Sequence, residues 1–148
     1  MKFSKILVPV AGLLIDDQAV RLACLTARPN KARVLLVHVI QVRRTQPLES
    51  ENLADIDRGE KFLAHADEIA HQMGVQAESE LLQARAVSPV LLDLATDRQM
   101  DLIVMGVPYH PPLDEFRLGT TVREILKNAR CQVWLCREQE RPEADKKR

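Results

Sequence analysis

Five short apolar runs alternate with four segments of helical spacing, and this alternation constrains the fold more than any other feature of the sequence. Three of the runs, residues 6–10, 34–40 and 102–105, are continuously apolar, which is typical of central parallel strands covered on both faces. Residues 75–81 alternate apolar and polar side chains, as a half-exposed edge strand does. Residues 133–136 form the fifth predicted strand.

The four intervening segments place apolar residues at positions i, i+3, i+4 and i+7, the pattern of an amphipathic helix. Ser88 is predicted to cap the third helix, with Pro89 at its first helical position. Gly74 stands where the second helix is expected to end, and Asp16 and Asp17 are expected to cap the first. The predicted apolar stripes span residues 19–26, 63–73, 87–95 and 122–129.

This order of strands and helices predicts a parallel sheet with helices on both faces. Because crossovers between parallel strands are right-handed, we expect a single doubly wound α/β sheet of five strands in the flavodoxin-like order 3-2-1-4-5. Ligands of such sheets bind at the carboxyl ends of the strands, where neighbouring connections diverge. The predicted ligand site therefore lies between the loops after Val10 and Met105. Residues 138–148 are almost all charged and are predicted to form a tail outside a domain of residues 1–137.

The composition disfavours some classes of binding partner. The 148 residues fit one domain, and 21 basic residues balance 21 acidic ones, so no general field attracts nucleic acid or an anionic membrane. The opening apolar run is too short for a membrane helix, and the cytoplasm is the expected location. The cysteines Cys24, Cys131 and Cys136 lack CxxC spacing and are predicted to be free thiols.

Other chemistry-bearing side chains favour structural interpretations. His38 lies inside an apolar strand and is expected to be a hydrogen-bonded core histidine. His65 and His71 are six residues apart, which does not match the i, i+4 spacing of a helical zinc site, so a solvated helix face is expected. Cys131 and Cys136 are predicted to point to opposite faces of the last strand. No constellation predicts a catalytic site or a metal site.

Several motifs together resemble the universal stress protein family. They are KILVPV followed by Gly12, VLLVHVI, DLIVMG, and a Gly-Thr pair before CQVWLCRE, and the resemblance runs from about Lys5 to Arg137. In that family the last part reads Gly, two residues, Gly, nine residues, Gly, then Ser or Thr. Here Gly106 and Gly119 keep the spacing, Tyr109 replaces the middle glycine, and Ala11 stands where the family commonly has an aspartate.

The resemblance implies an adenine nucleotide alpha-hydrolase-like fold, a role in surviving stress, and dimerisation through the last strand, at Val133, Trp134 and Leu135. For Trp134 the alternative is packing on the last helix of its own subunit. Many members bind ATP, although others bind no nucleotide. Carried over, the adenine position is Val39 and the ribose position is Ala11. The phosphate positions are Gly106, Gly119, Thr120 and Thr121, with Tyr109 in the place of the middle glycine.

The physical chemistry of the altered loop predicts weak or no binding of ATP and its magnesium ion. A phosphate cradle needs backbone N–H groups and room for close approach, whereas Tyr109 adds bulk and three nearby prolines have no N–H to donate. Ala11 offers no acceptor to a ribose hydroxyl. The helix start at Gly119 and Thr120 would still attract an anion, and Thr120 has a second interpretation as an N-cap residue. The prolines are Pro108, Pro111 and Pro112, and Asp114 and Glu115 between them and Gly119 would repel a triphosphate.

These features are compatible with three functions. The first is a non-catalytic regulatory module with a degenerate nucleotide pocket, which acts through an unknown protein partner or small ligand and uses the loop at Tyr109 and His110 as a contact surface. The second is an ATP-binding member of the family that acts as a nucleotide sensor or slow ATPase. The third is a flavin redox protein. The segment AGLLIDDQ disfavours it, because this loop lacks the hydroxyl side chains that would bind the flavin phosphate.

Overall fold

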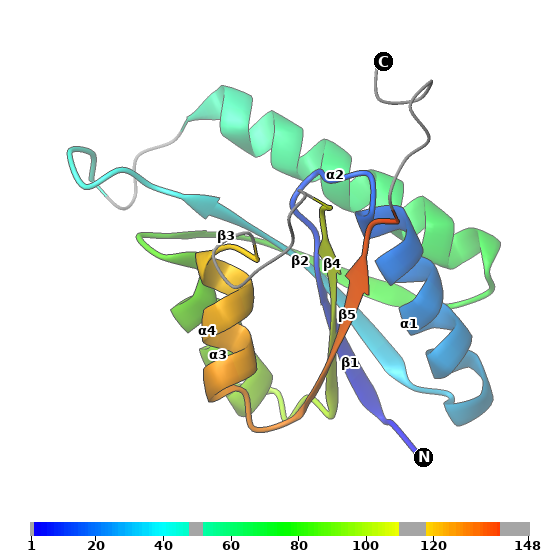
Figure 1. The fold of residues 1–148 in the computed structure, drawn as a ribbon. Coiled ribbons are helices and arrows are strands. Elements are labelled where there is room, and N and C mark those ends of the chain that lie inside the picture. The colour runs from blue at the N-terminus through cyan, green and yellow to red at the C-terminus, as the bar shows by residue number, and fades with distance from the viewer. Residues whose placement is uncertain (1, 48–51, 110–117, 140–148) are drawn as a thin grey trace.

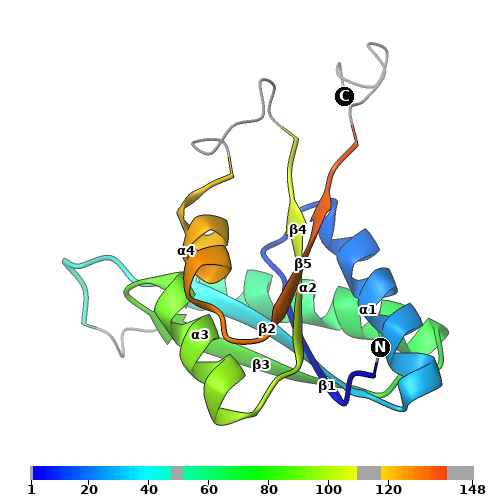
Figure 2. The same cartoon turned by 60° about the horizontal axis from the view of Figure 1, so that its bottom comes forward.

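In the computed structural model, which describes residues 2–47, 52–109 and 118–139, five parallel strands form one sheet in the order β3-β2-β1-β4-β5. Figures 1 and 2 show that helices cover both faces of this sheet. The predicted fold class and strand order are confirmed. The elements are β1 (Lys5–Pro9), α1 (Asp16–Asn30), β2 (Arg33–Gln41), α2 (Leu53–Gln72), β3 (Ala77–Ala84), α3 (Val87–Asp97), β4 (Leu102–Val107), α4 (Thr120–Asn128) and β5 (Gln132–Arg137).

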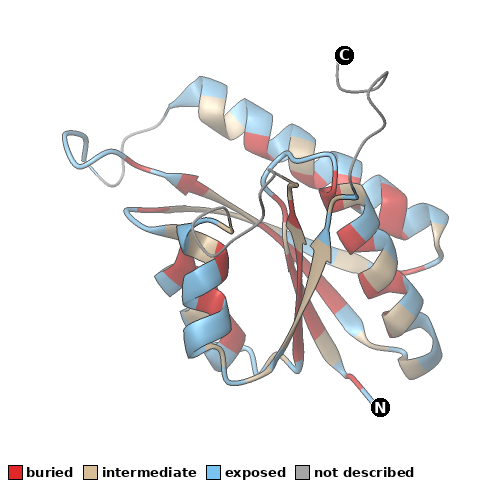
Figure 3. Ribbon diagram, in the orientation of Figure 1, coloured by how far each residue is buried: buried red, intermediate tan, exposed pale blue. Residues whose placement is uncertain are grey.

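The central strand β1 contributes to two hydrophobic cores, because successive side chains of a strand point to opposite faces. Ile6 and Val8 pack with the apolar sides of α1 and α2, and Leu7 packs with those of α3 and α4. All three side chains are fully buried, and each such burial stabilises the fold by about 1.5–3 kcal/mol. Figure 3 shows that burial is concentrated along β1 and its neighbours.

The starts of three helices differ from the sequence prediction. Helix α3 begins at Val87 with Ala86 as its N-cap residue, so the prediction that Ser88 caps it is wrong. Ser88 is instead a buried residue of the first turn. Gly119 is the N-cap residue of α4, so Thr120 is its first helical residue. In α1, Asp16 and Asp17 lie in the first turn and Ile15 holds the N-cap position without a side-chain cap.

Helix α2 is longer than its apolar stripe indicated, because it begins ten residues before Leu63. Asn52 caps it by accepting a hydrogen bond of 3.2 Å from the backbone N–H of Asp55. At the other end Gly74 has a φ of 73°, which agrees with its predicted place after the helix. Gly59 lies in the helix interior and is buried against the sheet. A methyl group there would lie 2.7 Å from Cδ2 of His38, so glycine lets α2 approach β2 closely.

The edge strand β5 is anchored on the face that carries α1 and α2. The rings of Trp134 and Phe3 meet edge to face with centroids 5.4 Å apart, and both belong to the core beneath α1. The alternative in which Trp134 packs on α4 is therefore wrong, because Trp134 lies on the opposite face from that helix. Cys136 shares its face, whereas Cys131 packs with the other core, as predicted.

Candidate functional site

The connections of β1 diverge at its carboxyl end. Strand β1 pairs with β2 on one side and with β4 on the other, and its loop continues into α1. The next helix after β4 is instead α4, which lies on the opposite face of the sheet from α1, as Figure 2 shows. This is the position at which doubly wound sheets bind ligands. We use the word crevice for this topological position, between the ends of β1 and β4.

Most of the predicted ligand residues lie at this end of the sheet. Ala11 is exposed directly after β1, Val39 is half-buried near the end of β2, and Gly106 lies near the end of β4. Gly119 and Thr120 are exposed, and Thr121 is half-buried in the first turn of α4. Residues 110–117, including Pro111, Pro112, Asp114 and Glu115 of the predicted loop, lie outside the described residues.

Tyr109 lies at the start of this loop and contacts β5. The guanidinium of Arg137 is 4.7 Å from the centroid of the Tyr109 ring, within the range of a cation–π interaction. Next to this pair, the backbone N–H of Glu138 donates a hydrogen bond of 2.7 Å to the carbonyl of Val107. Because β4 lies between β1 and β5, the Tyr109 ring is held on the β5 side of the crevice.

Asp16 is the functional candidate that sequence reasoning missed. Its Oδ2 accepts hydrogen bonds from the backbone N–H groups of Ala11, at 2.8 Å, and Leu13, at 3.0 Å. The side chain is only 7% exposed. Burial raises the pKa of this carboxyl above its usual value, and the backbone hydrogen bonds offset part of that rise. The sequence marked Asp16 only as a helix cap, and nothing in its spacing showed that it turns back toward the loop.

A residue larger than glycine would not fit at position 106, partly because of this same carboxylate. A methyl group on Gly106 would lie 2.8 Å from Cγ2 of Ile15 and 3.2 Å from Oδ1 of Asp16. Glycine at this position therefore lets the start of α1 pack against β4. This packing explains Gly106 without any ligand, and it brings a carboxylate to the edge of the crevice.

A second group of side chains lies on the α2 side of the β1 and β2 ends. Nδ1 of His38 is 2.7 Å from the carbonyl oxygen of Val10, which confirms the predicted hydrogen bond, but the side chain is half-buried and not part of the core. The Phe62 ring meets His38 edge to face and covers Gly12. A shallow pocket of about 230 Å³ opens beside them, lined by His38, Val39, Ile40, Gln41, Asp55, Arg58 and Phe62.

The predicted solvated face of α2 is confirmed, since His65 and His71 are both exposed. Nε2 of His65 lies 3.1 Å from the carboxylate of Asp17. In the parts of the chain that the structure describes, no three His, Cys, Asp or Glu side chains are grouped so that they could hold a metal ion. None of the helices among the described residues is long and apolar enough to cross a membrane.

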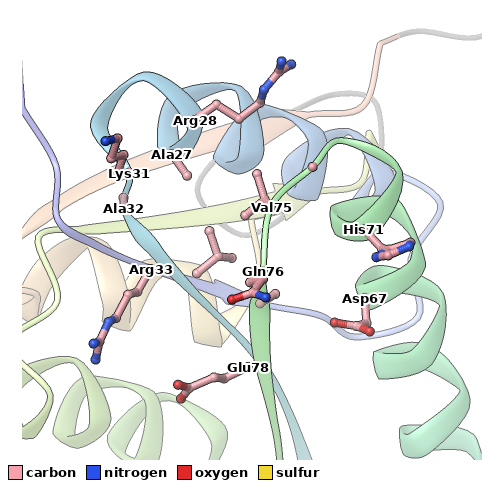
Figure 4. A pocket seen from close by; sticks show the side chains of 13 residues that line it. Ala27, Arg28, Lys31, Ala32, Arg33, Asp67, His71, Val75, Gln76 and Glu78 are labelled. Carbon is pink, nitrogen blue, oxygen red and sulfur yellow. The ribbon is translucent and has the colours of Figure 1, made fainter.

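A wider pocket of about 890 Å³ lies at the opposite, amino-terminal end of β2 and β3, as Figure 4 shows. Arg28, Lys31 and Arg33 come to it from the end of α1 and the start of β2, and Asp67 comes to it from α2. Its lining mixes both signs of charge and it is open to solvent. The pocket is therefore separate from the crevice, and its lining does not select one class of ligand.

Residues 2–137 match the sequence profile described as the Universal stress protein family. The chain belongs to this family. The relatives with curated names include a universal stress protein of Methanocaldococcus jannaschii, which is 26% identical over 137 residues that cover 88% of this chain and 80% of the relative. A putative universal stress protein of Staphylococcus saprophyticus is 27% identical over 150 residues, covering 97% and 89%.

Solved universal stress proteins share the fold. One from Archaeoglobus fulgidus in complex with dAMP superposes with a TM-score of 0.73 and 23% identity, covering 91% of this chain and 98% of that one. A family member from Arabidopsis thaliana with AMP bound gives a TM-score of 0.64 and 20% identity, covering 92% of both chains. At these identities the likeness establishes the fold of the universal stress proteins.

Proposed function

We propose that this universal stress protein is a regulatory module without turnover, and that its crevice binds an adenosine-like ligand with a weak grip on phosphate. The observation that carries the proposal is the pairing of a retained helix start with an altered loop. Gly119 and Thr120 at the start of α4 are exposed, and the N-cap residue has no side chain to cap the helix, while Ala11 and Tyr109 replace groups that hold a nucleotide in the family. The dAMP and AMP complexes of the solved relatives support the choice of ligand class.

A binding titration tests this proposal. Adenosine, AMP and Mg-ATP are titrated separately by isothermal calorimetry, with guanosine as the control for the base. We expect adenosine to bind at least as well as Mg-ATP, because a degenerate phosphate site adds little affinity. Tight binding of Mg-ATP with no measurable binding of adenosine would contradict the proposal, and so would the failure of every adenine compound to bind.

The second candidate is a nucleotide sensor or slow ATPase, favoured by the preserved spacing from Gly106 to Gly119 and Thr120. Thermal unfolding separates it from the first candidate. A ligand present at a hundred times its Kd stabilises the folded state by about 2.7 kcal/mol. Such a shift with millimolar Mg-ATP, together with steady release of phosphate, would favour the sensor or ATPase.

We also propose that two copies associate through β5. Val133, Trp134 and Leu135 are half-buried on a strand that lies at the edge of the sheet, and pairing β5 with its copy would satisfy the open edge. Val133→Glu is expected to shift the sedimentation velocity from dimer to monomer. Ser79→Glu on β3, the other edge strand, is the matched control and should leave the mass unchanged.

The domain is proposed to consist of residues 1–137, with residues 138–148 as a charged tail. Deletion of residues 140–148 keeps the backbone hydrogen bond between Glu138 and Val107 and should leave the free energy of unfolding unchanged.

A further inference from the structure

Asp16 is a buried acid without a cationic partner among the described residues. The backbone N–H groups of Ala11 and Leu13, in the loop that connects β1 to α1, donate hydrogen bonds to it, and the backbone of Gly12 between them also lowers its pKa. The neighbouring Asp17 differs, because it lies near His65 at the surface. The charge of Asp16 is therefore balanced only by the dipoles of the loop and of the first turn of α1.

Those dipoles are the groups that bind phosphate in many doubly wound proteins. Successive backbone N–H groups between the first strand and the first helix form a concave site for an anion. In this chain the concave site is already filled, since one oxygen of Asp16 accepts two of its hydrogen bonds. The loop has its own anion and cannot offer the same donors to a ligand.

The second carboxylate oxygen of Asp16 lies near β4. Oδ1 lies close enough to Gly106 that a methyl group there would be 3.2 Å from it. Gly106 is also the first of the positions proposed for phosphate. Because Ile15 closes this face of Gly106, a phosphate bound at the end of β4 would lie near the carboxylate without touching it, in a partly buried setting where water screens the repulsion poorly.

We propose that Asp16 is a specificity-determining residue whose carboxylate serves as a built-in anion and biases the crevice toward uncharged nucleosides over nucleotides. This inference rests on the proposed function and names its ligand class more closely. The crevice would then respond to adenosine or a related nucleoside, and phosphorylation of that ligand would weaken binding.

The test compares Asp16→Asn with the wild type and with Asp17→Asn, the matched control one residue away. Adenosine and AMP are titrated into each form, and the ratio of their Kd values is the measurement. We expect Asp16→Asn to raise the affinity for AMP relative to adenosine about tenfold, because one nearby like charge has been removed. Asp17→Asn should leave the ratio unchanged. If Asp16→Asn fails to fold, Asp16→Ser keeps an acceptor oxygen without the charge.

The outcomes separate this inference from the proposed function. If adenosine and AMP bind every form with the same ratio, the crevice binds adenine ligands and the role of Asp16 is overturned. If Asp16→Asn and Asp17→Asn change the ratio equally, the loss of any negative charge in this region has the same effect, and the specific role of Asp16 is again overturned. If neither compound binds any form, the proposed function falls, and the specificity role falls with it.

Discussion

Substitution of Gly12 by alanine tests whether the β1–α1 loop is fixed by the ring beneath it. Gly12 has a φ of 81°, a conformation that costs a residue with a side chain about 1–2 kcal/mol. The added methyl group would also lie 2.7 Å and 2.8 Å from Cε2 and Cε1 of Phe62, well inside van der Waals contact. Such overpacking typically costs a further 1–3 kcal/mol. The expected loss of stability is therefore about 2–5 kcal/mol for Gly12→Ala.

Gly74→Ala is the matched control. Gly74 has a φ of 73°, but a methyl group there would meet nothing within 4 Å. Only the conformational term applies, so its loss should be smaller than that of Gly12→Ala by about 1–3 kcal/mol. Urea unfolding followed by the fluorescence of Trp134, the only tryptophan, measures both variants.

A double variant checks the cause of that difference. Phe62→Leu shortens the side chain beneath Gly12, so Gly12→Ala should cost less in the Phe62→Leu background than in the wild type. Equal losses for Gly12→Ala and Gly74→Ala would refute the reasoning. Strict additivity of the two changes would refute it as well, because the ring would then not be the obstacle.

Three further predictions concern titratable side chains. Because burial raises the pKa of Asp16, its stabilising contribution is complete below the unfolded value of 3.8 and is lost as the pH rises through the folded value. The wild type should therefore lose stability relative to Asp16→Asn in urea unfolding as the pH rises above 3.8, and the opposite trend would contradict the assigned direction of the shift. His65→Ala should lower stability by no more than about 1 kcal/mol by the same measurement, since its contact with Asp17 is exposed to solvent. Burial also raises the pKa of the Cys24 and Cys136 thiols, and iodoacetamide should label the half-buried Cys136 faster than the fully buried Cys24 in the native protein, a difference that disappears in urea.

The sheet was predictable because its signal is spread over many residues. The three continuously apolar runs could be satisfied only between two layers of helices, and all three became central strands. The expected β3, residues 75–81, begins two residues later and ends three later, at Ala77–Ala84. Its later residues pair with β2 through backbone groups, which every sequence carries, so side-chain alternation could not mark its end.

The helix starts were harder to predict for a related reason. The first buried residue of α2 is Gly59, six residues after the helix begins at Leu53, so only the N-cap residue Asn52 marked its beginning. At α3 the serine and proline signals were correct for a helix start but were assigned to the wrong positions, since Ala86 has the extended conformation that precedes the helix.

The location of the site could be predicted from the sequence, but the presence of the Asp16 carboxylate beside it could not. The end of β1 and the end of β4 follow from topology, whereas the turn of Asp16 toward Ala11 depends on backbone geometry at five residues' separation. Likewise, Tyr109 could be recognised as a replacement for glycine, but its contact with Arg137 joins two strands that are distant in the sequence.

The two edges of the sheet have different side chains, and this limits how the protein can assemble. Strand β3 carries Glu78 and Glu80, the latter bound to Arg98, whereas the middle of β5 is uncharged from Val133 to Cys136. If copies join only through β5, as proposed, each pair exposes two β3 edges, where the exposed Glu78 disfavours pairing with a further strand. Association through β5 alone would then stop at two molecules, whereas two edges that both pair with other copies would allow open-ended fibres.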